Sequence, residues 1–245
     1  MKKDLKGRIA FLMGASRGMG RAISLRLAAA GVRIAAAADE MGDLLILQKD
    51  IKSLGGECIV YELDVLDCKS LEEAFKDTEN KLGNINIFYN GVGIVPVGTI
   101  ESLSIEQINR VLDINIKGMI YGTRTVIPYL RKNGGGNIIN VSSMAATRGL
   151  GTPPDYNGVY TATKWAINGF DECMEKYLVS DNIRVSTLCP GSTDTSIWKG
   201  DTPFPREQMI PAEYIAEIVE MILCAPDSVV FKQVRLAAAV EINNF

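Results

Sequence analysis

The sequence contains no histidine, and its five cysteines include no C-x-x-C pair. Zinc sites are built mainly from histidine and cysteine, so we expect no metal site. Without imidazole, proton transfer near neutral pH must come from another side chain whose pKa is shifted by its surroundings. The cysteines are scattered and odd in number, which indicates reduced thiols and a cytoplasmic location.

Long apolar runs and a strong net charge are also missing. No apolar run reaches the ~18 residues of a membrane span, and no signal-peptide core follows the charged N-terminus. The formal net charge is −3 with 22% charged residues, so nothing electrostatic favours nucleic acid or an anionic membrane as a partner. The 245 residues suit a single α/β domain over 1–245, with enough length for a core.

Apolar, strand-like runs alternate with helical stretches along the whole chain. The runs lie near 8–13, 32–38, 57–63, 85–90, 137–142, 183–189 and 228–236. Regular alternation predicts a Rossmann-like, doubly wound parallel sheet of about seven strands with helices on both faces.

A glycine-rich turn follows the first of these runs. Residues 14–20 are GASRGMG, and an alanine- and leucine-rich helical stretch continues to about Ala30. Strand, glycine turn and helix are the context that a dinucleotide site requires, because glycine admits the pyrophosphate and the helix N-terminus offers free N–H groups. The alternative is a plain tight turn.

Tyr160 and Lys164 lie one helical turn apart in the stretch VYTATKWAING. Residues i and i+4 share a helix face. A lysine ammonium beside a phenol favours phenolate, so we expect the pKa of Tyr160 to fall below its usual value of about 10. Such a pair could move protons near neutral pH; the alternative is an ordinary surface pair.

Several ordered motifs extend this pattern from Gly14 to about Thr195. They are Asp64-Val65 after the third strand, Asn90-Gly91-Val92-Gly93 after the fourth, Asn115 in DINIKG, Ile139-Asn140-Val141-Ser142-Ser143 after the fifth, and Pro190-Gly191 after the sixth. Together with GASRGMG and YTATK, they resemble the short-chain dehydrogenase/reductase family. The motifs fall at the carboxyl ends of strands, where open α/β sheets bind their ligands.

The resemblance implies an NAD(P)-dependent oxidoreductase that moves a hydride between nicotinamide and a secondary alcohol or ketone. It implies that Tyr160 is the general acid/base and that Lys164 lowers its pKa and binds the nicotinamide ribose. Ser143, chosen over Ser142 because the family places the catalytic serine second, would bind the substrate oxygen. Asn115 would hold a water that relays protons to Lys164. The alternative for Ser143 is a loop or capping serine, and the alternative for Asn115 is a structural helix kink.

The resemblance also implies which residues bind the cofactor. They are Gly14, Ser16, Arg17, Gly18, Met19, Gly20, Asp39, Asp64, Val65, Asn90, Gly91, Tyr160, Lys164, Pro190, Gly191, Thr193 and Thr195. Asp39, just past the second strand, can accept hydrogen bonds from ribose hydroxyls and repel a 2′-phosphate. Arg17 occupies a position where relatives that prefer NADP often carry a base. We favour NAD over NADP, with Arg17 either solvated or paired with Asp39.

The segment 193–211 is rich in proline and predicts a substrate lid. Its apolar residues either form a substrate wall or pack on the sheet; they are Ile197, Trp198, Phe204, Met209 and Ile210. Ser143 and Tyr160 are 17 positions apart (160 − 143), which is longer than is usual in the family. We expect the extra residues to bulge within 151–158, beside the substrate.

The substrate stays open at the level of sequence. A 3-oxoacyl-carrier-protein (or 3-oxoacyl-CoA) reductase is one alternative, although Ser180-Asp181-Asn182 replaces a segment that is basic in those enzymes. A non-catalytic dinucleotide-binding regulator is the alternative of another class. The complete set of Asn115, Ser143, Tyr160 and Lys164 favours catalysis. The helices expected at 103–131 and 158–180 carry more apolar residues than one buried stripe needs, and the resemblance implies that they pair in a homodimer or homotetramer.

Overall fold

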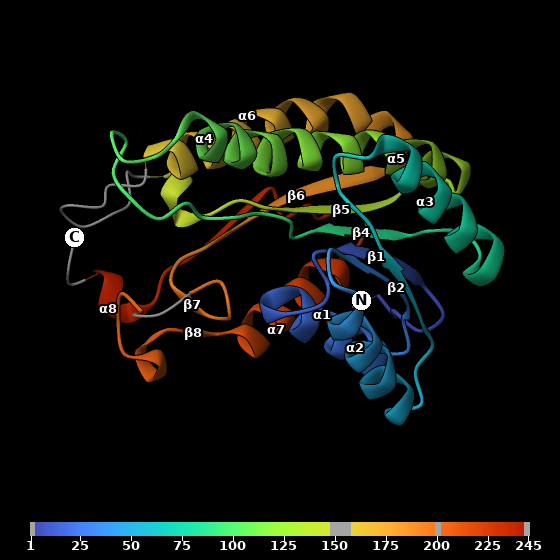
Figure 1. The fold of residues 1–245 in the computed structure, drawn as a ribbon. Helices are drawn as coiled ribbons and strands as arrows, with labels where there is room; N and C mark the ends of the chain where they lie inside the picture. Colours follow the sequence, from blue (N-terminus) through green and yellow to red (C-terminus); the bar gives the residue numbers. More distant parts are fainter. Residues whose placement is uncertain (1–2, 148–157, 199–201, 243–245) are drawn as a thin grey trace.

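The centre of the fold is one seven-stranded sheet in the order β3-β2-β1-β4-β5-β6-β9 (Figure 1). The computed structural model describes residues 3–147, 158–198 and 202–242. The strands of this sheet are β1 (Ile9–Met13), β2 (Arg33–Ala38), β3 (Cys58–Glu62), β4 (Ile87–Asn90), β5 (Gly136–Val141), β6 (Ile183–Pro190) and β9 (Gln233–Leu236). The helices are α1 (Gly18–Ala29), α2 (Met41–Ser53), α3 (Cys68–Leu82), α4 (Ile105–Leu112), α5 (Met119–Lys132), α6 (Gly158–Leu178), α7 (Ala212–Leu223) and the short α8 (Ala239–Ile242). Every pairing within this sheet is parallel, so the predicted doubly wound α/β fold is confirmed.

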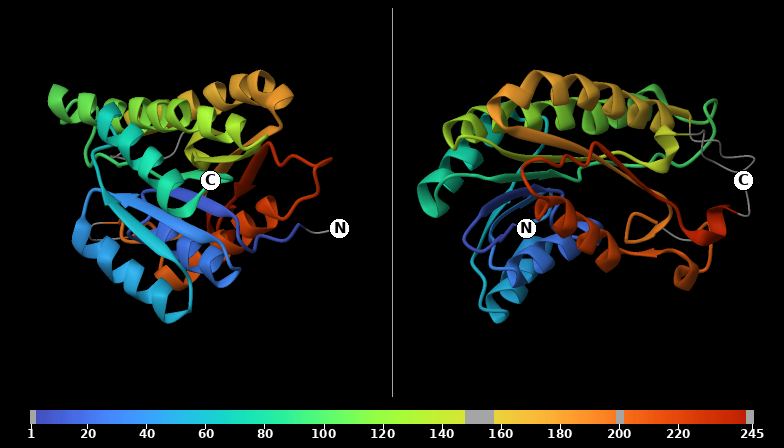
Figure 2. Two further views of the ribbon diagram at one scale, coloured as in Figure 1. Left: turned by 90° about the vertical axis from the view of Figure 1, so that its right-hand side faces the viewer. Right: turned by 180° about the vertical axis from the view of Figure 1, so that it is seen from behind.

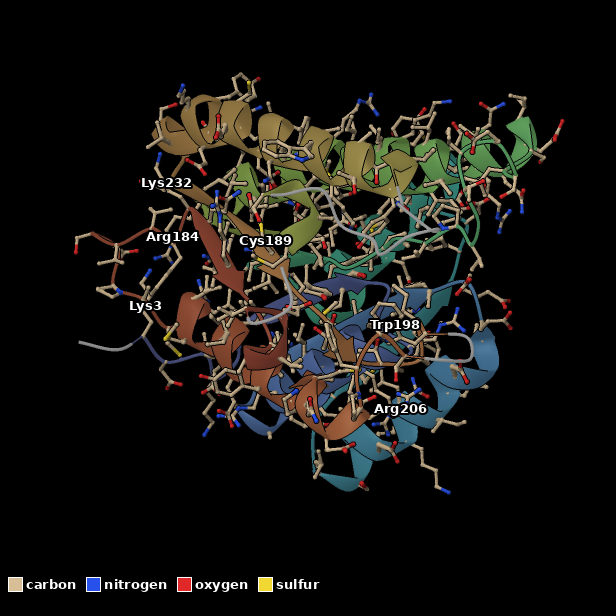
Figure 3. The ribbon with its side chains drawn as sticks, turned by 90° about the vertical axis from the view of Figure 1, so that its left-hand side faces the viewer. Lys3, Arg184, Cys189, Trp198, Arg206 and Lys232 are labelled. Carbon is tan, nitrogen blue, oxygen red and sulfur yellow. The ribbon has the colours of Figure 1, made fainter. Side chains whose placement is uncertain are left out.

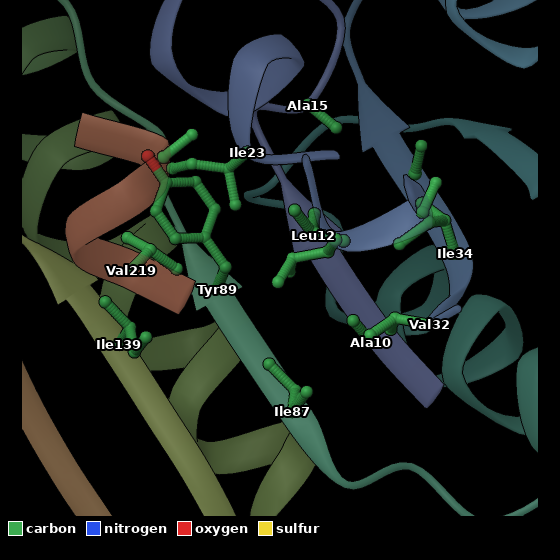
Figure 4. Close-up of a cluster of buried hydrophobic side chains, with 14 of the residues drawn as sticks. Ala10, Leu12, Ala15, Ile23, Val32, Ile34, Ile87, Tyr89, Ile139 and Val219 are labelled. Carbon is green, nitrogen blue, oxygen red and sulfur yellow. The ribbon is translucent and has the colours of Figure 1, made fainter. Parts of the chain in front are cut away.

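Both faces of the sheet are buried under helices. Successive side chains of a strand point to opposite faces, and in β1 Ala10 and Leu12 join one core while Phe11 and Met13 join the other. The first core lies under α1, α2 and α7, and part of it, with Leu12 and Tyr89, is drawn in Figure 4. The other face is covered by α3, α5 and α6, as the views in Figure 2 show. Burial on both faces explains why the run IAFLM holds no polar residue.

The long helical stretch predicted at 103–131 is interrupted in the structure. A capping box of Ser104 and Gln107 starts α4. A π-helical turn over Asp113–Gly118 then separates α4 from α5. Such turns interrupt the regular α-helical hydrogen bonding, and they are frequent at functional sites. None of the helices that the structure describes is long and apolar enough to cross a membrane.

One predicted strand is shorter than expected, and the segment predicted as a lid contains strands of its own. The last sheet strand begins at Gln233 and not near residue 228, because residues 227–228 form a turn and 229–232 form no regular element. The segment predicted as a lid contains two short strands, β7 (Thr193–Asp194) and β8 (Ile210–Pro211), which pair in parallel. This pairing joins the two ends of the segment; residues 199–201 within it lie outside the described residues.

The order of the sheet reverses between β1 and β4. From β1 the chain runs outward through β2 to β3, and from β4 it runs to the opposite edge. Met13 at the end of β1 lies opposite Asn90 at the end of β4, so the turns after these strands are neighbours. Open α/β sheets bind ligands at this kind of switch point, outside the carboxyl ends of the strands.

Candidate active site

The glycine turn after β1 brings backbone close to backbone. A Cβ on Gly20 would lie 2.0 Å from the carbonyl oxygen of Gly14, and one on Gly14 would lie 3.0 Å from the carbonyl group of Gly91. Gly14 and Gly18 have φ values of +73° and +53°, which favour glycine. Helix α1 begins at Gly18 with no side-chain cap and no acidic residue in its first turn. Its free N–H groups and the positive end of its dipole suit an anion such as a pyrophosphate.

Other predicted cofactor residues lie in this turn or next to it. Ser16, within the turn, is buried, and Met19 packs on the core at the start of α1. Thr195 reaches the same helix end, because a Cβ on Gly18 would lie 3.1 Å from the Cβ of Thr195. The structure therefore gathers these residues at the N-terminus of α1.

Arg17 and Asp39 form an ion pair at the ends of β1 and β2. The Nη2 of Arg17 lies 3.3 Å from Oδ1 of Asp39. Of the two arrangements expected for Arg17, the structure has the pair. The side chains are 54% and 70% exposed, so the pair itself adds little to stability.

The ends of β3 and β4 hold the next predicted residues. Asp64 is exposed and its Oδ1 accepts a hydrogen bond from the N–H of Leu66, at 2.9 Å. Val65 packs against the helix that contains Gly118, where a Cβ would lie 2.7 Å from it. Asn90 is buried and its Nδ2 donates to the carbonyl of Met119 at 3.1 Å. Its Oδ1 is buried with no partner in the described part of the chain.

Asn115 lies in the π-helical turn and is fully buried. Its Oδ1 accepts from the N–H of Ile94 at 2.8 Å, and its Nδ2 donates to the carbonyl of Ile94 at 2.9 Å. The same Nδ2 lies 3.2 Å from Oγ1 of Thr163, the neighbour of Lys164. Asn115 therefore ties the chain after β4 to the start of α6.

Ser143, Tyr160 and Lys164 meet where β5 ends and α6 begins. The hydroxyl of Ser143 is close enough to the phenol of Tyr160 to oppose the rise in the pKa of that phenol. Ser142 is not equivalent, because its Oγ donates to the backbone carbonyl of Lys164 at 3.0 Å. The buried Nζ of Lys164 lies 5.5 Å from the centre of the Tyr160 ring and donates to the carbonyl of Val141 at 2.9 Å.

The pKa shifts of this pair correct one expectation from the sequence. Burial raises the pKa of Tyr160, and the hydrogen bond with Ser143 opposes that rise only in part. Burial also lowers the pKa of Lys164 to about 8. The predicted fall in the pKa of Tyr160 is therefore wrong for this arrangement, because the loss of water around the buried phenol dominates the shift.

The turn after β6 borders the same site. The N–H of Gly191 donates to the carbonyl of Leu236 at 2.6 Å, and the hydroxyl of Thr193 donates to the carbonyl of Gly191 at 3.0 Å. Pro190 ends β6, and its carbonyl lies 3.5 Å from Oγ of Ser143. This contact brings the predicted Pro190-Gly191 motif next to the predicted catalytic serine.

The apolar residues of the segment 193–211 divide between the two arrangements expected for them. Met209 and Ile210 are buried, so they pack as core. Ile197 is 43% exposed, and Trp198 and Phe204 are half-buried. Figure 3 labels Trp198, which belongs to this segment. The bulge expected within 151–158 lies almost wholly outside the described residues.

A groove of about 760 Å³ runs between α1 and α7 and begins at the N-terminus of α1. Gly18 and Thr195 line the groove at the N-terminus of α1, and arginines line its walls. Each of these arginines is paired with a carboxylate: Arg17 with Asp39, Arg21 with Asp50, Arg26 with Glu217 and Glu220, and Arg206 with Asp194. The described residues contain no cluster of three side chains suited to a metal ion.

Sequence reasoning missed two buried carboxylates near this site. Asp171 in α6 accepts hydrogen bonds from Asn140 of β5 and Thr187 of β6. Glu241 in α8 accepts hydrogen bonds from Ser192, next to the Pro190-Gly191 motif. No local pattern marks either residue, since their partners are distant in the chain.

Comparisons with known proteins agree with this geometry. A family model described as short chain dehydrogenase matches residues 8–205. An uncharacterized oxidoreductase of Staphylococcus epidermidis is 29% identical, with 95% of this chain and 97% of the relative covered. A 3-oxoacyl-[acyl-carrier-protein] reductase of Thermotoga maritima is 31% identical, with 78% of this chain and 76% of the relative covered.

Two solved structures are similar over nearly the whole chain. A short chain dehydrogenase from Mycobacterium paratuberculosis bound to NAD has a TM-score of 0.86 and 26% identity, covering 96% of this chain and 97% of the other. An alcohol dehydrogenase from Thermococcus sibiricus complexed with 5-hydroxy-NADP has a TM-score of 0.85 and 26% identity, covering 95% and 97%. The fold and the family thus agree, while the neighbours bind both kinds of nicotinamide cofactor.

Proposed function

The chain belongs to the short-chain dehydrogenase family of oxidoreductases, and from this premise we propose an NAD-preferring enzyme that acts on a secondary alcohol or ketone. One observation carries the proposal: Ser143, Tyr160 and Lys164 meet at the carboxyl end of the sheet, with Asn115 behind them. A binding protein without catalysis has no need of this whole group.

The described residues fit a dinucleotide at the switch point. The turn of residues 14–20 has no room for side chains at Gly20, and the start of α1 offers free N–H groups. A bound nicotinamide would supply the hydride donor or acceptor. Asn90, Gly91, Asp64 and Val65 would border the adenosine half, and the turn from Pro190 to Thr195 would border the nicotinamide half.

The protein's own residues would then handle the proton. In reduction, the phenol of Tyr160 gives its proton to the carbonyl oxygen, and Ser143 donates a hydrogen bond to that oxygen. The raised pKa of Tyr160 keeps the phenol protonated near neutral pH. Lys164, with a pKa of about 8, is mostly charged at pH 7 and can replace the proton of Tyr160.

We also propose that NAD is preferred over NADP. Asp39 is exposed just past β2 and can accept hydrogen bonds from ribose hydroxyls. Its carboxylate holds Arg17 at 3.3 Å, so the arginine charge is partly neutralised where a 2′-phosphate would need it. Repulsion by Asp39 then weakens binding of NADPH.

The arrangement of the chain supports three further proposals. Residues 1–245 would act as a single cytoplasmic domain, and the segment 193–211 would close over the substrate as a lid.

The helices within 103–131 and 158–180 would form an isologous interface in a homodimer or homotetramer. On α6, Trp165 and Tyr177 are 52% and 58% exposed, which is consistent with a partner. Light scattering that gave a stable monomer at micromolar concentration would contradict this assembly.

A 3-oxoacyl-carrier-protein reductase is a second candidate, supported by the Thermotoga maritima relative. An acidic carrier needs free basic groups on the surface that it meets. In this chain Arg131 is paired with Asp181 at 2.7 Å, which removes one such group. We therefore rank this candidate below a smaller alcohol or ketone.

The function can be tested with a panel of ketones and 3-oxoacyl thioesters, each assayed with NADH and with NADPH. We expect oxidation of NADH with at least one ketone, and loss of that activity in Tyr160→Phe. Turnover confined to the thioesters would favour the second candidate. Tight cofactor binding with no turnover on any compound would instead support a non-catalytic regulator.

A further inference from the structure

A buried carboxylate from the C-terminal helix lies against the turn that follows β6. Glu241 is 2% exposed. Its Oε1 accepts hydrogen bonds from the N–H of Ser192 at 2.8 Å and from the hydroxyl of Ser192 at 2.6 Å. Its Oε2 accepts from the N–H of Ala238 at 2.9 Å. Such charge-assisted hydrogen bonds are the strong ones, and they offset part of the cost of burying the charge.

The contact leaves no room for a side chain on the turn. A Cβ on Gly191 would lie 2.1 Å from Oε2 of Glu241. In the described residues, no lysine or arginine nitrogen forms an ion pair with Glu241. The carboxylate is therefore held by N–H and O–H groups of the turn and by the N–H of the residue just before its own helix, and it fixes the turn in return.

The same turn is anchored on its other sides. The carbonyl of Ser192 accepts from the N–H of Ile210, at 2.9 Å, which starts the β7–β8 pair. The carbonyl of Thr193 accepts from Nε1 of Trp198 at 3.0 Å. Two residues further on, Thr195 contacts the start of α1 at Gly18. The position of Ser192 thus determines where the chain from Thr193 to Thr195 runs.

We infer that Glu241 is a positioning residue of the cofactor site: its carboxylate holds the Gly191–Ser192 turn so that Thr193 and Thr195 face the cofactor. The inference rests on the proposed function, because it assumes that a nicotinamide cofactor borders this turn. It adds α8, far from the dinucleotide motifs in sequence, to the machinery that shapes the site. Glu241 touches no reacting atom, so its loss should weaken cofactor binding more than it slows the chemical step.

Glu241→Gln is the sharpest test, because it keeps the shape of the side chain. One of the two oxygens becomes an NH₂ group, which then faces either the N–H of Ser192 or the N–H of Ala238. Neither backbone group can turn away. Glu57→Gln is the matched control: it makes the same chemical change at an exposed glutamate just before β3, outside the residues assigned to the site.

Cofactor affinity is measured by titration with NADH, and the position of the turn is measured without any cofactor. The sequence has two tryptophans, so Trp165→Phe leaves Trp198, whose indole is bonded to Thr193, as the reporter. In Glu241→Gln we expect a changed Trp198 emission and a Kd for NADH raised roughly 10-fold or more, the range for losing a hydrogen bond to a charged group. The kcat at saturating NADH should change far less, and Glu57→Gln should match the parent in every measurement.

A second variant covers the case in which Glu241→Gln does not fold. Ser192→Ala removes one donor and keeps the carboxylate, and it should raise the Kd for NADH in the same direction. Where both variants fold, their effects should be non-additive, because they break one contact.

Two results would overturn the inference. One is a Kd for NADH equal to that of the parent in both variants, with only a lower Tm; Glu241 would then be purely structural. The other is an unchanged Trp198 emission, because the turn would then keep its position without the carboxylate. A parent protein that binds neither NADH nor NADPH would refute the proposed function instead, and the emission data would still decide whether Glu241 positions the turn.

Discussion

Replacing Asp171 with asparagine should make the stability of the protein less dependent on pH between about 6 and 8. Asp171 is completely buried in α6, two turns after Lys164. Its Oδ1 accepts from Nδ2 of Asn140 at 2.6 Å, and its Oδ2 accepts from the hydroxyl of Thr187 at 2.7 Å. The carboxyl therefore connects α6 to β5 and β6 in the interior of the protein.

Burial raises the pKa of Asp171 from 3.8 to about 7, against the opposing effect of its hydrogen bonds with Thr187 and Asn140. The charge of Glu175 adds to the rise. At a pH between these two pKa values, Asp171 holds a proton in the folded protein that it has released in the unfolded chain. The stabilisation is complete below the pKa of the unfolded chain, and it is lost as pH rises through the pKa of the folded protein.

The size of the effect follows from the two pKa values. The full loss from acidic pH to pH 8 is about 4 kcal/mol, because each pKa unit corresponds to about 1.4 kcal/mol. Only about 1.4 kcal/mol of this loss falls between pH 6 and pH 8. Asparagine does not titrate, so the variant should lack this part of the pH dependence.

Urea unfolding of both proteins at pH 6, 7 and 8 measures the effect. Histidine cannot contribute, since the chain has none, and Lys164 titrates equally in both proteins. The free energy of unfolding of wild type, minus that of Asp171→Asn, should fall by about 1.4 kcal/mol from pH 6 to pH 8. Glu172→Gln, at an exposed neighbour in α6, should leave the slope unchanged. Parallel curves for wild type and Asp171→Asn would show that Asp171 is ionised throughout this range and would refute the reasoning.

Three further predictions concern the site itself. Tyr160→Phe should reduce turnover by ~10²–10⁴-fold, the usual effect of losing a general acid/base, while NADH binding measured by titration stays nearly unchanged. Lys164→Met should impair both turnover and NADH binding. Near-normal turnover of Tyr160→Phe would contradict the assignment of Tyr160 as the general acid/base. Asp39→Arg should shift the ratio of Kd values toward NADPH, and a wild type that strongly prefers NADPH would reverse the cofactor proposal. Amide exchange in the described parts of 193–211 should slow when cofactor and substrate analogue are added together, and exchange as slow as that of β5 in the free protein would identify fixed structure.

Much of the site could be predicted because each motif is local. The residues GASRGMG lie between a buried run and a helical run, and only glycine fits at Gly20, where a Cβ would lie 2.0 Å from a carbonyl oxygen. Tyr160 and Lys164 share a helix face through their spacing alone. The choice between Ser142 and Ser143 was different, because it came from a family resemblance. The physical distinction appears in space, where Ser142 bonds the backbone of α6 and Ser143 meets Tyr160.

The sequence by itself determined the class of fold, the order of the strands along the chain and the motifs at their carboxyl ends. These follow from apolar periodicity, glycine positions and short spacings, which are properties of neighbouring residues. Only the tertiary structure decided the direction of the pKa shifts of Tyr160 and Lys164, because burial depends on which segments fold over a side chain. It also decided that Asp171 accepts hydrogen bonds from β5 and β6 and that Glu241 accepts hydrogen bonds from the turn after β6. Those contacts join residues up to 49 positions apart, and no local pattern records them.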